Sequence, residues 1–448
     1  MLIQQSPDVY EKLRHLGGMA TDDVLSVNGA EGRSIPRPDW HGIAARGGVT
    51  PHAGVYRAAM PNGKRLSLLR VMFTDYCMMD CFYCPNSHWV PRKRYGFKVD
   101  ELAKLFDEMH RRQTVDGLFL SSGIFKDPNA TQERLLAVVE TVRRKYGFRG
   151  YIHLKVMPGT TDTGLIVAAQ RLGTRLSINM EQPSEELLNR ISTMKRWNAG
   201  MLQPMLRIQR LMEETYGGSV GQATQLVVGA ADETDWDIHV RQRHLYRELG
   251  FKRIYYSAFR PIKYTPLEEH PPTPLVREHR LYQLDWLTRV YRFNDDELAL
   301  AFDDGFLDHR ADPKLRIAVE QYDRFPMDIN TASHDDLLRV PGIGPMAAER
   351  IVRQRMRHTI DNQRDLQAMG VVLKRALPFV RFAGHRPVRA KQSMLPLFQA
   401  LSSDPAPAPA AAAAAHERHA HTDCAACPLS SATCGMAATA PSPAALAA

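Results

Sequence analysis

Short apolar runs rich in β-branched residues alternate with amphipathic helical stretches over residues 66–262 of this 448-residue chain. Six runs are expected to be strands: SLLRVMF (67–73), GLFLSS (117–122), YIHLKVM (151–157), RLSINM (175–180), TQLVVG (224–229) and RIYYSAF (253–259). Helical patterns such as VDELAKLFDEMHRR lie between them, with apolar residues three and four positions apart. This alternation predicts a parallel sheet, either doubly wound or curled into a partial barrel. Both architectures place their site at the carboxyl ends of the strands.

Composition divides the rest of the chain into further segments. Residues 1–65 are rich in Gly, Pro and Arg, and we expect them to form an irregular leader. Residues 263–325 are expected to be a helical and loop extension, and residues 326–385 a compact helical region. Residues 386–448 run through the Pro/Ala-rich linker SDPAPAPAAAAAA into a tail that we expect to be disordered.

The composition argues against two classes of protein. No stretch resembles a membrane span or a signal peptide, which predicts a cytoplasmic protein without a membrane partner. Six cysteines are too few for a disulfide scaffold at this length, so we expect them to be reduced. The net charge of +9 favours a polyanionic partner.

Three cysteines, Cys77, Cys81 and Cys84, follow the first expected strand. Thiolates select zinc, copper(I) or iron–sulfur clusters. Structural zinc normally takes four protein ligands, for which His88 could supply the fourth, whereas a cubane held by three cysteines leaves one iron open. Alternatively, the spacing puts the cysteines on one helix face as buried small hydrophobes, but Pro85 and the preceding strand favour a loop.

The spacing Cys-x3-Cys-x2-Cys, with Tyr83 before the last cysteine, resembles the cluster loop of radical S-adenosylmethionine enzymes. The resemblance implies the partial (β/α)6 barrel of that family and a 4Fe–4S cluster on Cys77, Cys81 and Cys84. It also implies that S-adenosylmethionine chelates the open iron. One electron, from a reductant such as flavodoxin or ferredoxin, would then release a 5′-deoxyadenosyl radical that abstracts hydrogen.

The same resemblance extends to the ends of the later strands. It implies a cosubstrate lined by Tyr83, Ser121, Ser122, Gly123, Ser177, Asn179, Glu181 and Gly229. The family's Gly-Gly-Glu turn lacks its glutamate in LSSGIF, so backbone carbonyls or a hydroxyl would hold the methionine amino group. The alternating side chains of SINME suit ribose hydroxyls, and the glycine after the next strand would let the backbone approach adenine. Such residues at strand ends are also common in ordinary turns.

Four further polar residues are candidate substrate contacts: His153, Lys155, Tyr256 and Arg260. A packing or salt-bridge role is an equal alternative for each.

The segment LLRVPGIGPMAAERIV resembles a helix–hairpin–helix, an element that binds DNA irrespective of the base sequence. The residues expected to contact DNA are Val340, Gly342, Ile343, Gly344, Arg350 and Arg353, with Arg355 and Arg357 as further phosphate contacts. The glycines lack Cβ atoms, which lets the backbone approach a phosphate. The following helix presents its N–H groups and the positive end of its dipole. The alternatives are a packing device or a protein contact.

Two features of the C-terminal segment are weaker signals. QSMLPLF, through Gln392, Leu395, Leu397 and Phe398, resembles the peptide with which repair proteins dock on a sliding clamp, although a last strand folding back is an alternative. Cys424, Cys427 and Cys434, with His421 nearby, are enough ligands for zinc or a second cluster. CAACPLSSAT is also similar to the first cysteine pair of iron–sulfur uracil-DNA glycosylases, so an unused remnant is an equal alternative.

Over residues of roughly 60–385 the chain resembles the DNA modification/repair radical S-adenosylmethionine proteins that carry a C-terminal helix–hairpin–helix. LFLSSGIF, GYIHLKVMPG, SINMEQP and VPGIG carry the match. The resemblance implies radical chemistry on DNA, with modification or repair as the outcome. Two alternatives stay open: a radical enzyme that acts on RNA or protein, and a DNA-binding accessory protein of a repair complex with a structural metal site.

Overall fold

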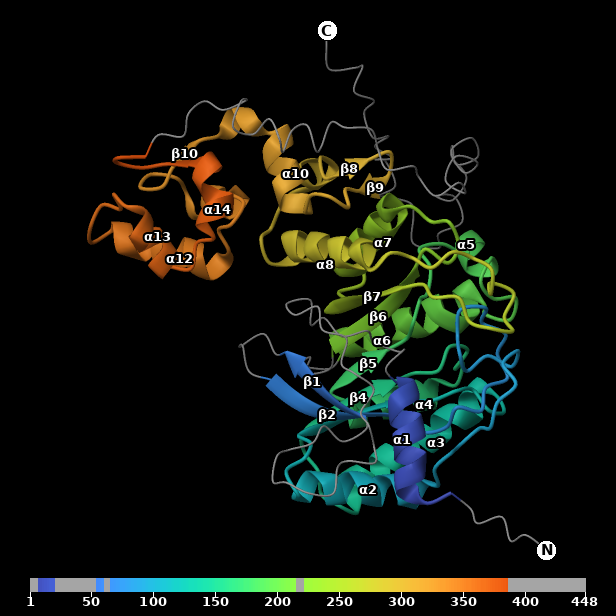
Figure 1. The fold of residues 1–448 in the computed structure, drawn as a ribbon. Coiled ribbons are helices and arrows are strands. Elements are labelled where there is room, and N and C mark those ends of the chain that lie inside the picture. Colours follow the sequence, from blue (N-terminus) through green and yellow to red (C-terminus); the bar gives the residue numbers. More distant parts are fainter. Residues whose placement is uncertain (1–6, 21–53, 60–64, 215–220, 386–448) are drawn as a thin grey trace, which may run out of the picture. The chain divides into compact units, whose positions relative to one another are not determined.

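The structure is a computed structural model that describes residues 7–20, 54–59, 65–214 and 221–385 (Figure 1). The chain divides into two compact units, residues 1–278 and 279–448. The predicted clamp peptide, 392–398, and the tail cysteines Cys424, Cys427 and Cys434 lie outside the described residues.

Six parallel strands form most of the sheet of the first unit. They are the six expected ones: β2 (Arg65–Met72), β3 (Gly117–Ser121), β4 (Tyr151–Lys155), β5 (Arg175–Ser177), β6 (Gly221–Val228) and β7 (Arg253–Ala258). Each pairs with the next along the chain, with Leu69 opposite Leu118 and Leu154 opposite Leu176. A further strand, β1 (Val55–Ala59), pairs antiparallel with β2, so the order runs from β1 to β7.

Helices connect the parallel strands of the first unit (Figure 1). They are α2 (Val99–Arg111), α3 (Pro128–Arg144), α4 (Thr163–Leu172), α5 (Glu185–Asn189), η2 (Trp197–Leu202), α6 (Gln203–Glu214) and α7 (Asp235–Arg247). α2 packs against α3, α3 against α4, and α4 against α6, so these helices form one continuous layer. Right-handed crossovers between successive strands place their helices on the same face, which curls the sheet instead of winding it in two directions. The unit is therefore the partial (β/α)6 barrel that the resemblance implied.

The described part of the leader is more regular than expected. It contains β1 and an amphipathic helix, α1 (Val9–Met19), which packs against β2. Asp8 caps α1 by accepting a hydrogen bond from the Glu11 amide, and Leu13 and Leu16 are buried. The abundance of Gly and Pro in residues 1–65 hid this short pattern.

Two strands end earlier than the sequence predicts. β4 ends at Lys155 and β5 at Ser177, before the expected ends at residues 157 and 180. Residues 178–180 leave the ladder, and Glu181 takes up a left-handed backbone (φ 68°) and bridges to Leu226. The apolar pattern continues past Ser177 because Ile178 and Met180 are buried without being paired as strand residues.

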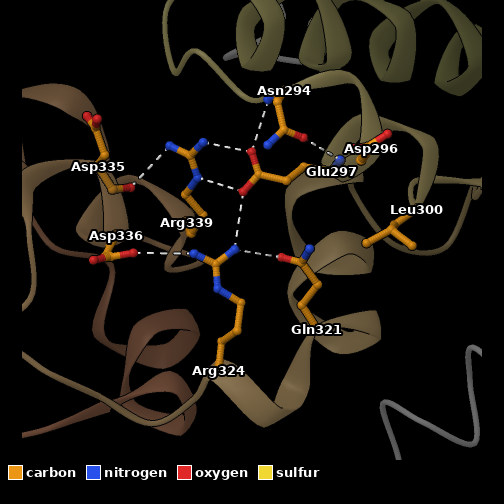
Figure 2. Close-up of a pocket in the computed structure, with 9 residues that line it drawn as sticks. All are labelled: Asn294, Asp296, Glu297, Leu300, Gln321, Arg324, Asp335, Asp336 and Arg339. Carbon is orange, nitrogen blue, oxygen red and sulfur yellow. Dashed lines mark hydrogen bonds and ion pairs between the residues drawn. The ribbon is translucent and has the colours of Figure 1, made fainter.

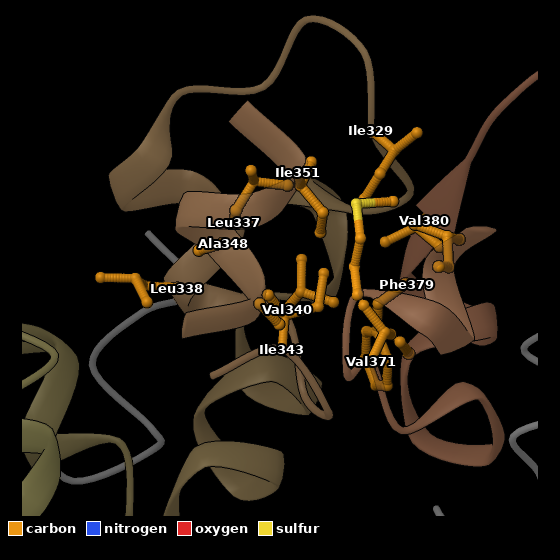
Figure 3. Packing of buried hydrophobic residues seen from close by; sticks show 14 of the residues in the cluster. Ile329, Leu337, Leu338, Val340, Ile343, Ala348, Ile351, Val371, Phe379 and Val380 are labelled. Carbon is orange, nitrogen blue, oxygen red and sulfur yellow. The ribbon is translucent and has the colours of Figure 1, made fainter. Parts of the chain in front are cut away.

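The second unit is mainly helical, and α8 (Leu275–Arg289) crosses the boundary between the two units. Its other elements are α9 (Asp295–Ala299), β8 (Phe302–Asp303), β9 (Phe306–Leu307), α10 (Pro313–Glu320), η3 (Tyr322–Arg324), β10 (Met327–Asp328), α11 (His334–Arg339), α12 (Pro345–Arg355), α13 (Gln363–Ala368), α14 (Leu373–Ala376), η4 (Leu377–Phe379) and β11 (Val380–Arg381). β10 pairs with β11. Figure 3 shows the apolar core, in which Val340 and Ile343 belong to the same cluster as Val371 and Phe379.

This core joins two hairpins of similar construction, α11–α12 and α13–α14. Ser333 caps α11 and Asn362 caps α13 through their side chains. Gly342 (φ 86°) and Gly370 (φ 91°) supply the left-handed backbone at the two turns. The second turn is poorer in glycine, and the sequence reading does not predict this repeat.

Candidate functional site

A pocket opens at the carboxyl ends of the parallel strands in the first unit. Cys77, Cys81 and Cys84 line it, together with side chains that follow or end the later strands, among them Ser122, Lys155, Asn179, Gln225 and Ser257. Parallel strands bring residues far apart in sequence to one edge of a sheet. The pocket lies where both predicted architectures placed the site.

The three cysteines lie in a loop, so the interpretation that they form one helix face is wrong. The Met78 amide donates to the Ile124 carbonyl at 2.7 Å, and the Phe82 amide donates to the Ile191 carbonyl at 2.9 Å. A Cβ on Gly123 would collide with the Tyr76 carbonyl, so this glycine lets the loop approach the end of β3. Burial raises the pKa of Cys81 to about 11.

Asp80 fastens the cysteine loop to the segment that follows α5. Its carboxylate accepts hydrogen bonds from Ser192 Oγ at 2.5 Å and from the Thr193 amide and hydroxyl, both at 2.7 Å. Burial acts against ionisation of Asp80, but these hydrogen bonds outweigh it and lower the pKa. Asp80 is therefore a structural anchor of the loop.

Lys195 is buried and connects the cysteine loop to the end of β5. Its Nζ lies 2.7 Å from Tyr83 Oη and 2.7 Å from Glu181 Oε1. Burial opposes its charge, but Cys81 and Glu181 outweigh burial and raise the pKa of Lys195. Burial and the neighbouring Cys81 and Glu181 raise the pKa of Tyr83 far above its ordinary value, so this phenol is neutral. Sequence reasoning missed Lys195, because no spacing links it to either partner.

The predicted cosubstrate residues divide into two groups in the structure. Tyr83, Ser122, Gly123, Asn179 and Glu181 line the pocket. Glu181 Oε2 is buried and has no hydrogen-bond partner in the part of the chain that the structure describes. The same is true of Oε1 of Gln225, a second pocket residue that the sequence reading did not select. Buried acceptors without donors fit a ligand that supplies N–H or O–H groups.

Three other predicted cosubstrate residues do not line this pocket: Ser121, Ser177 and Gly229. Ser177 Oγ lies 2.8 Å from His153 Nε2. The Gly229 amide donates to the Glu233 carboxylate, and a Cβ on Gly229 would collide with Thr273 Oγ1. The left-handed glycine after β6 thus has a packing role.

The four candidate substrate contacts also separate. Lys155 and Arg260 line the pocket. His153 stacks on Phe119 with ring centroids 4.3 Å apart, and burial lowers its pKa well below the ordinary value. The Tyr256 hydroxyl donates to Gln242 at 3.0 Å, away from the pocket. His153 and Tyr256 therefore have the packing role that was the alternative.

His88, the candidate fourth zinc ligand, is not part of the pocket lining, and its Nδ1 lies 3.2 Å from the Met78 carbonyl. Within residues 7–20, 54–59, 65–214 and 221–385, no three His, Cys, Asp or Glu side chains converge as ligands of a single ion. A cubane does not require such convergence, because its thiolates bind different iron atoms.

The predicted hairpin lies between α11 and α12. The absent Cβ of Gly342 makes room for the Val372 carbonyl, 2.7 Å from where that Cβ would be, and the Val372 amide donates to the Gly342 carbonyl at 3.0 Å. Gly342 is thus required by packing within the protein. Gly344 is the N-cap residue of α12, and a Cβ there would make only an ordinary contact with Tyr291 Oη. Gly344 is therefore less tightly packed within the protein than Gly342.

The four arginines of α12 and its end differ in their surroundings. Arg355 donates to the Ile329 and Ala332 carbonyls, so it holds the preceding loop. Arg353 pairs with Glu349 on the surface. Arg350 donates to the Met369 carbonyl at 3.3 Å, and Arg357 is exposed. Arg355 is therefore a structural residue, whereas Arg350, Arg353 and Arg357 remain predicted phosphate contacts.

A polar cavity of about 500 Å³ lies in the second unit between α9, η3 and α11 (Figure 2). Glu297 is at its centre and accepts hydrogen bonds from Arg339 at 2.7 and 2.9 Å and from Arg324 at 3.2 Å. Arg324 also reaches Gln321 and Asp336. Burial opposes ionisation of Glu297, but these donors lower its pKa, so the network ties α11 to the preceding segment.

None of the described helices is long and apolar enough to cross a membrane.

Comparison with protein families identifies the domains that contain the cysteine pocket and the hairpin. Residues 71–211 match the model of the Radical SAM superfamily, and residues 326–371 match that of the helix-hairpin-helix motif. The chain therefore contains a radical SAM domain, the domain of enzymes that use a 4Fe–4S cluster and S-adenosylmethionine, followed by a helix-hairpin-helix motif. A search of curated proteins finds no match.

Solved structures similar to this one include a synthase, a hydrogenase maturase and an oxidase that is a radical SAM enzyme. Methylornithine synthase (PylB) is 16% identical with a TM-score of 0.38, covering 47% of this chain and 58% of its own. HydG, a maturase of the [FeFe]-hydrogenase, is 15% identical with a TM-score of 0.40, covering 49% of each chain. Coproporphyrinogen III oxidase (HemN) from Escherichia coli is 14% identical with a TM-score of 0.33, covering 48% and 50%. The chain thus spans about half the length of the structures it matches.

Proposed function

We propose that this protein is a radical S-adenosylmethionine enzyme that modifies or repairs nucleic acid, with DNA held by the helix–hairpin–helix. The observation that carries the first part is the pocket itself. It gathers three cysteines at the strand ends beside Glu181, whose Oε2 is a buried acceptor without a donor among the described residues.

In this proposal Cys77, Cys81 and Cys84 hold a 4Fe–4S cluster. The cluster and S-adenosylmethionine would supply a 5′-deoxyadenosyl radical for hydrogen abstraction. Tyr83, Ser122, Gly123, Asn179 and Glu181 would surround the cosubstrate. Lys155 and Arg260 also line the pocket, and these cationic side chains would contact the substrate or the methionine carboxylate.

The cluster is tested by anaerobic reconstitution with iron and sulfide, followed by metal analysis and electron paramagnetic resonance. We expect Cys81→Ala to lose the cluster signal of the reduced protein. Met78→Ala is the matched control, since it truncates an exposed side chain of the same loop that does not line the pocket, and we expect it to keep that signal. A Cys81→Ala protein with the full iron content and signal would overturn the assignment.

The DNA part of the proposal rests on the match to the helix-hairpin-helix motif and on the net charge of +9. Arg350 lies in the middle of α12 and Arg353 in its last turn, and both would bind backbone phosphates. The slope of log affinity against log salt changes by about 0.9 for each phosphate contact, so Arg350→Gln/Arg353→Gln should flatten it by roughly 1.8. An unchanged slope would remove these residues from the interface.

The accessory-protein alternative makes a different prediction. A structural metal site would leave reductive cleavage of S-adenosylmethionine absent in a protein with a verified cluster. A radical enzyme for RNA or protein would cleave the cosubstrate but respond to those molecules and not to DNA.

A further inference from the structure

A buried lysine lies directly beneath the turn of the hairpin. Lys314, near the start of α10, is 8% exposed, and its Nζ lies 2.6 Å from the Ile343 carbonyl oxygen. The same ammonium group lies 4.6 Å from the centre of the Tyr291 ring. Both residues precede the segment that matches the helix-hairpin-helix model, which begins at residue 326.

The contact to Ile343 fixes the orientation of one peptide group of the turn. The Ile343–Gly344 peptide bond is trans. The C=O and N–H of a trans peptide point in opposite directions. With the carbonyl directed at Lys314, the Gly344 N–H points away from the lysine.

The neighbouring peptide group is also fixed from within the unit. The Gly342 carbonyl accepts from the Val372 amide at 3.0 Å, and the Ile343 amide donates to the Val340 carbonyl at 3.1 Å. Glu297, through Arg339 and Arg324, ties α11 to α9 and η3 (Figure 2). The segment 291–325 therefore braces the hairpin at its turn and at its first helix.

We propose that Lys314 is a positioning residue for DNA: it holds the Ile343 carbonyl on the protein side of the turn and so presents the Gly344 N–H to a backbone phosphate. This inference rests on the proposed DNA-binding function of the hairpin. It extends the DNA-binding region upstream to residues that the hairpin motif does not include.

The charge of Lys314 supplies a pH signature for this role. Burial lowers its pKa to about 7, Asp312 raises it, and Arg375 and Arg339 lower it further. These are the charged groups that act on the ammonium, beside the Tyr291 ring. A phosphate at the turn would favour the protonated amine, so DNA binding should take up a proton and affinity should fall as pH rises from 7 to 9.

The test compares the full-length wild type with Lys314→Met, using a fluorescent duplex of random sequence at several salt concentrations and at pH 7, 8 and 9. At pH 7 we expect Lys314→Met to bind roughly tenfold more weakly, as for loss of one charge-assisted hydrogen bond. Its salt slope should equal that of the wild type, because Lys314 orients the amide without contacting phosphate itself. Its affinity should also be independent of pH in this range.

Two controls separate the possible failures. Arg350→Gln, a proposed direct contact, should reduce the salt slope, and circular dichroism must show that Lys314→Met is folded. If the wild type binds DNA and Lys314→Met binds it equally well, or if Lys314→Met lowers the salt slope by about one, the positioning role is wrong. If the wild type does not bind DNA at any salt concentration, the proposed DNA-binding function of the hairpin is wrong, and the positioning role of Lys314 is then wrong as well.

Hydrogen exchange of the peptide that contains Gly344 gives an independent readout. DNA should protect this peptide in the wild type and protect it less in Lys314→Met at equal DNA occupancy. Equal protection in the two proteins would overturn the proposal.

Discussion

Individual residues of the cysteine pocket have roles that the sequence could not predict. The sequence was enough to predict the cysteine loop, a site at the strand ends and the family resemblance, because each of these depends on residues that are close together along the chain. Lys195 and Asp80 were not, since their partners lie on other elements. Gly229 is predicted to approach the cosubstrate, and nothing in the sequence indicated that it also packs against Thr273, more than 40 positions away along the chain.

Replacing only one residue of the Lys195–Glu181 ion pair should lower the stability of the protein considerably. Removing one partner of a buried ion pair typically costs about 3–5 kcal/mol, because the other charge is left unpaired. We expect Lys195→Met to lower the free energy of unfolding by about this amount, and Lys195→Met/Glu181→Gln to recover part of it. Anaerobic denaturant unfolding measures both, with the exposed Lys252→Met as the matched control. A single variant as stable as the wild type would contradict this account.

Gly123 should be essential for the shape of the cysteine loop. Gly123→Ala places a methyl group against the Tyr76 carbonyl and 3.0 Å from Cys77 Cβ, so the loop must move. Overpacking of this kind typically costs ~1–3 kcal/mol, and we expect less iron per chain after reconstitution. Gly18→Ala is the control, because a Cβ there meets nothing within 4 Å. Equal iron content in both variants would show that the loop tolerates the displacement.

At the scale of elements, the sequence was enough to predict that the six strands and the first hairpin exist. It predicted the ends of the strands less accurately. The six strands were found from apolar runs, but β4 and β5 end early because buried residues continue the pattern outside the ladder. The VPGIG turn marked the first hairpin. The second hairpin was not predicted, because it resembles the first in which positions are buried but has few residues identical to it.

The two glycines of the first turn should respond differently to substitution. Gly342→Ala must adopt a left-handed backbone, which costs about 1–2 kcal/mol, and its methyl group also meets the Val372 carbonyl. Gly344 has an ordinary backbone (φ −97°), so Gly344→Ala should cost less, only the modest loss expected when alanine replaces glycine at an N-cap. Thermal unfolding followed by circular dichroism tests this order. A Gly344→Ala protein less stable than Gly342→Ala would reverse it.

Lys314 should also make the stability of the second unit depend on pH. Its pKa of about 7 in the folded unit is below the ordinary value of 10.5, so the unfolded chain binds the proton more tightly. Its contribution to the free energy of unfolding therefore rises as pH increases from about 7 toward 10. We expect this rise in the wild type relative to Lys314→Met, measured by denaturant unfolding between pH 7 and 9. A parallel pH dependence in both proteins would mean that Lys314 does not titrate there.

At the scale of the whole molecule, the sequence predicted the order of the two sites but not how they work together. The pocket with the cysteines belongs to the first unit and the hairpin to the second. Local motifs reveal which chemistry each unit can support. The substrate atom is set by placement of a ligand in the pocket, which no motif records.

The central claim is that radical chemistry in the first unit serves a nucleic acid bound by the second. Its most direct test is anaerobic: the reconstituted, reduced protein receives S-adenosylmethionine, and 5′-deoxyadenosine is quantified with and without duplex DNA. We predict that DNA increases the yield in the wild type, that Arg350→Gln/Arg353→Gln weakens the increase, and that Cys81→Ala gives no product. A wild-type protein with a verified cluster that forms no 5′-deoxyadenosine, or forms it equally with and without DNA, would contradict the claim.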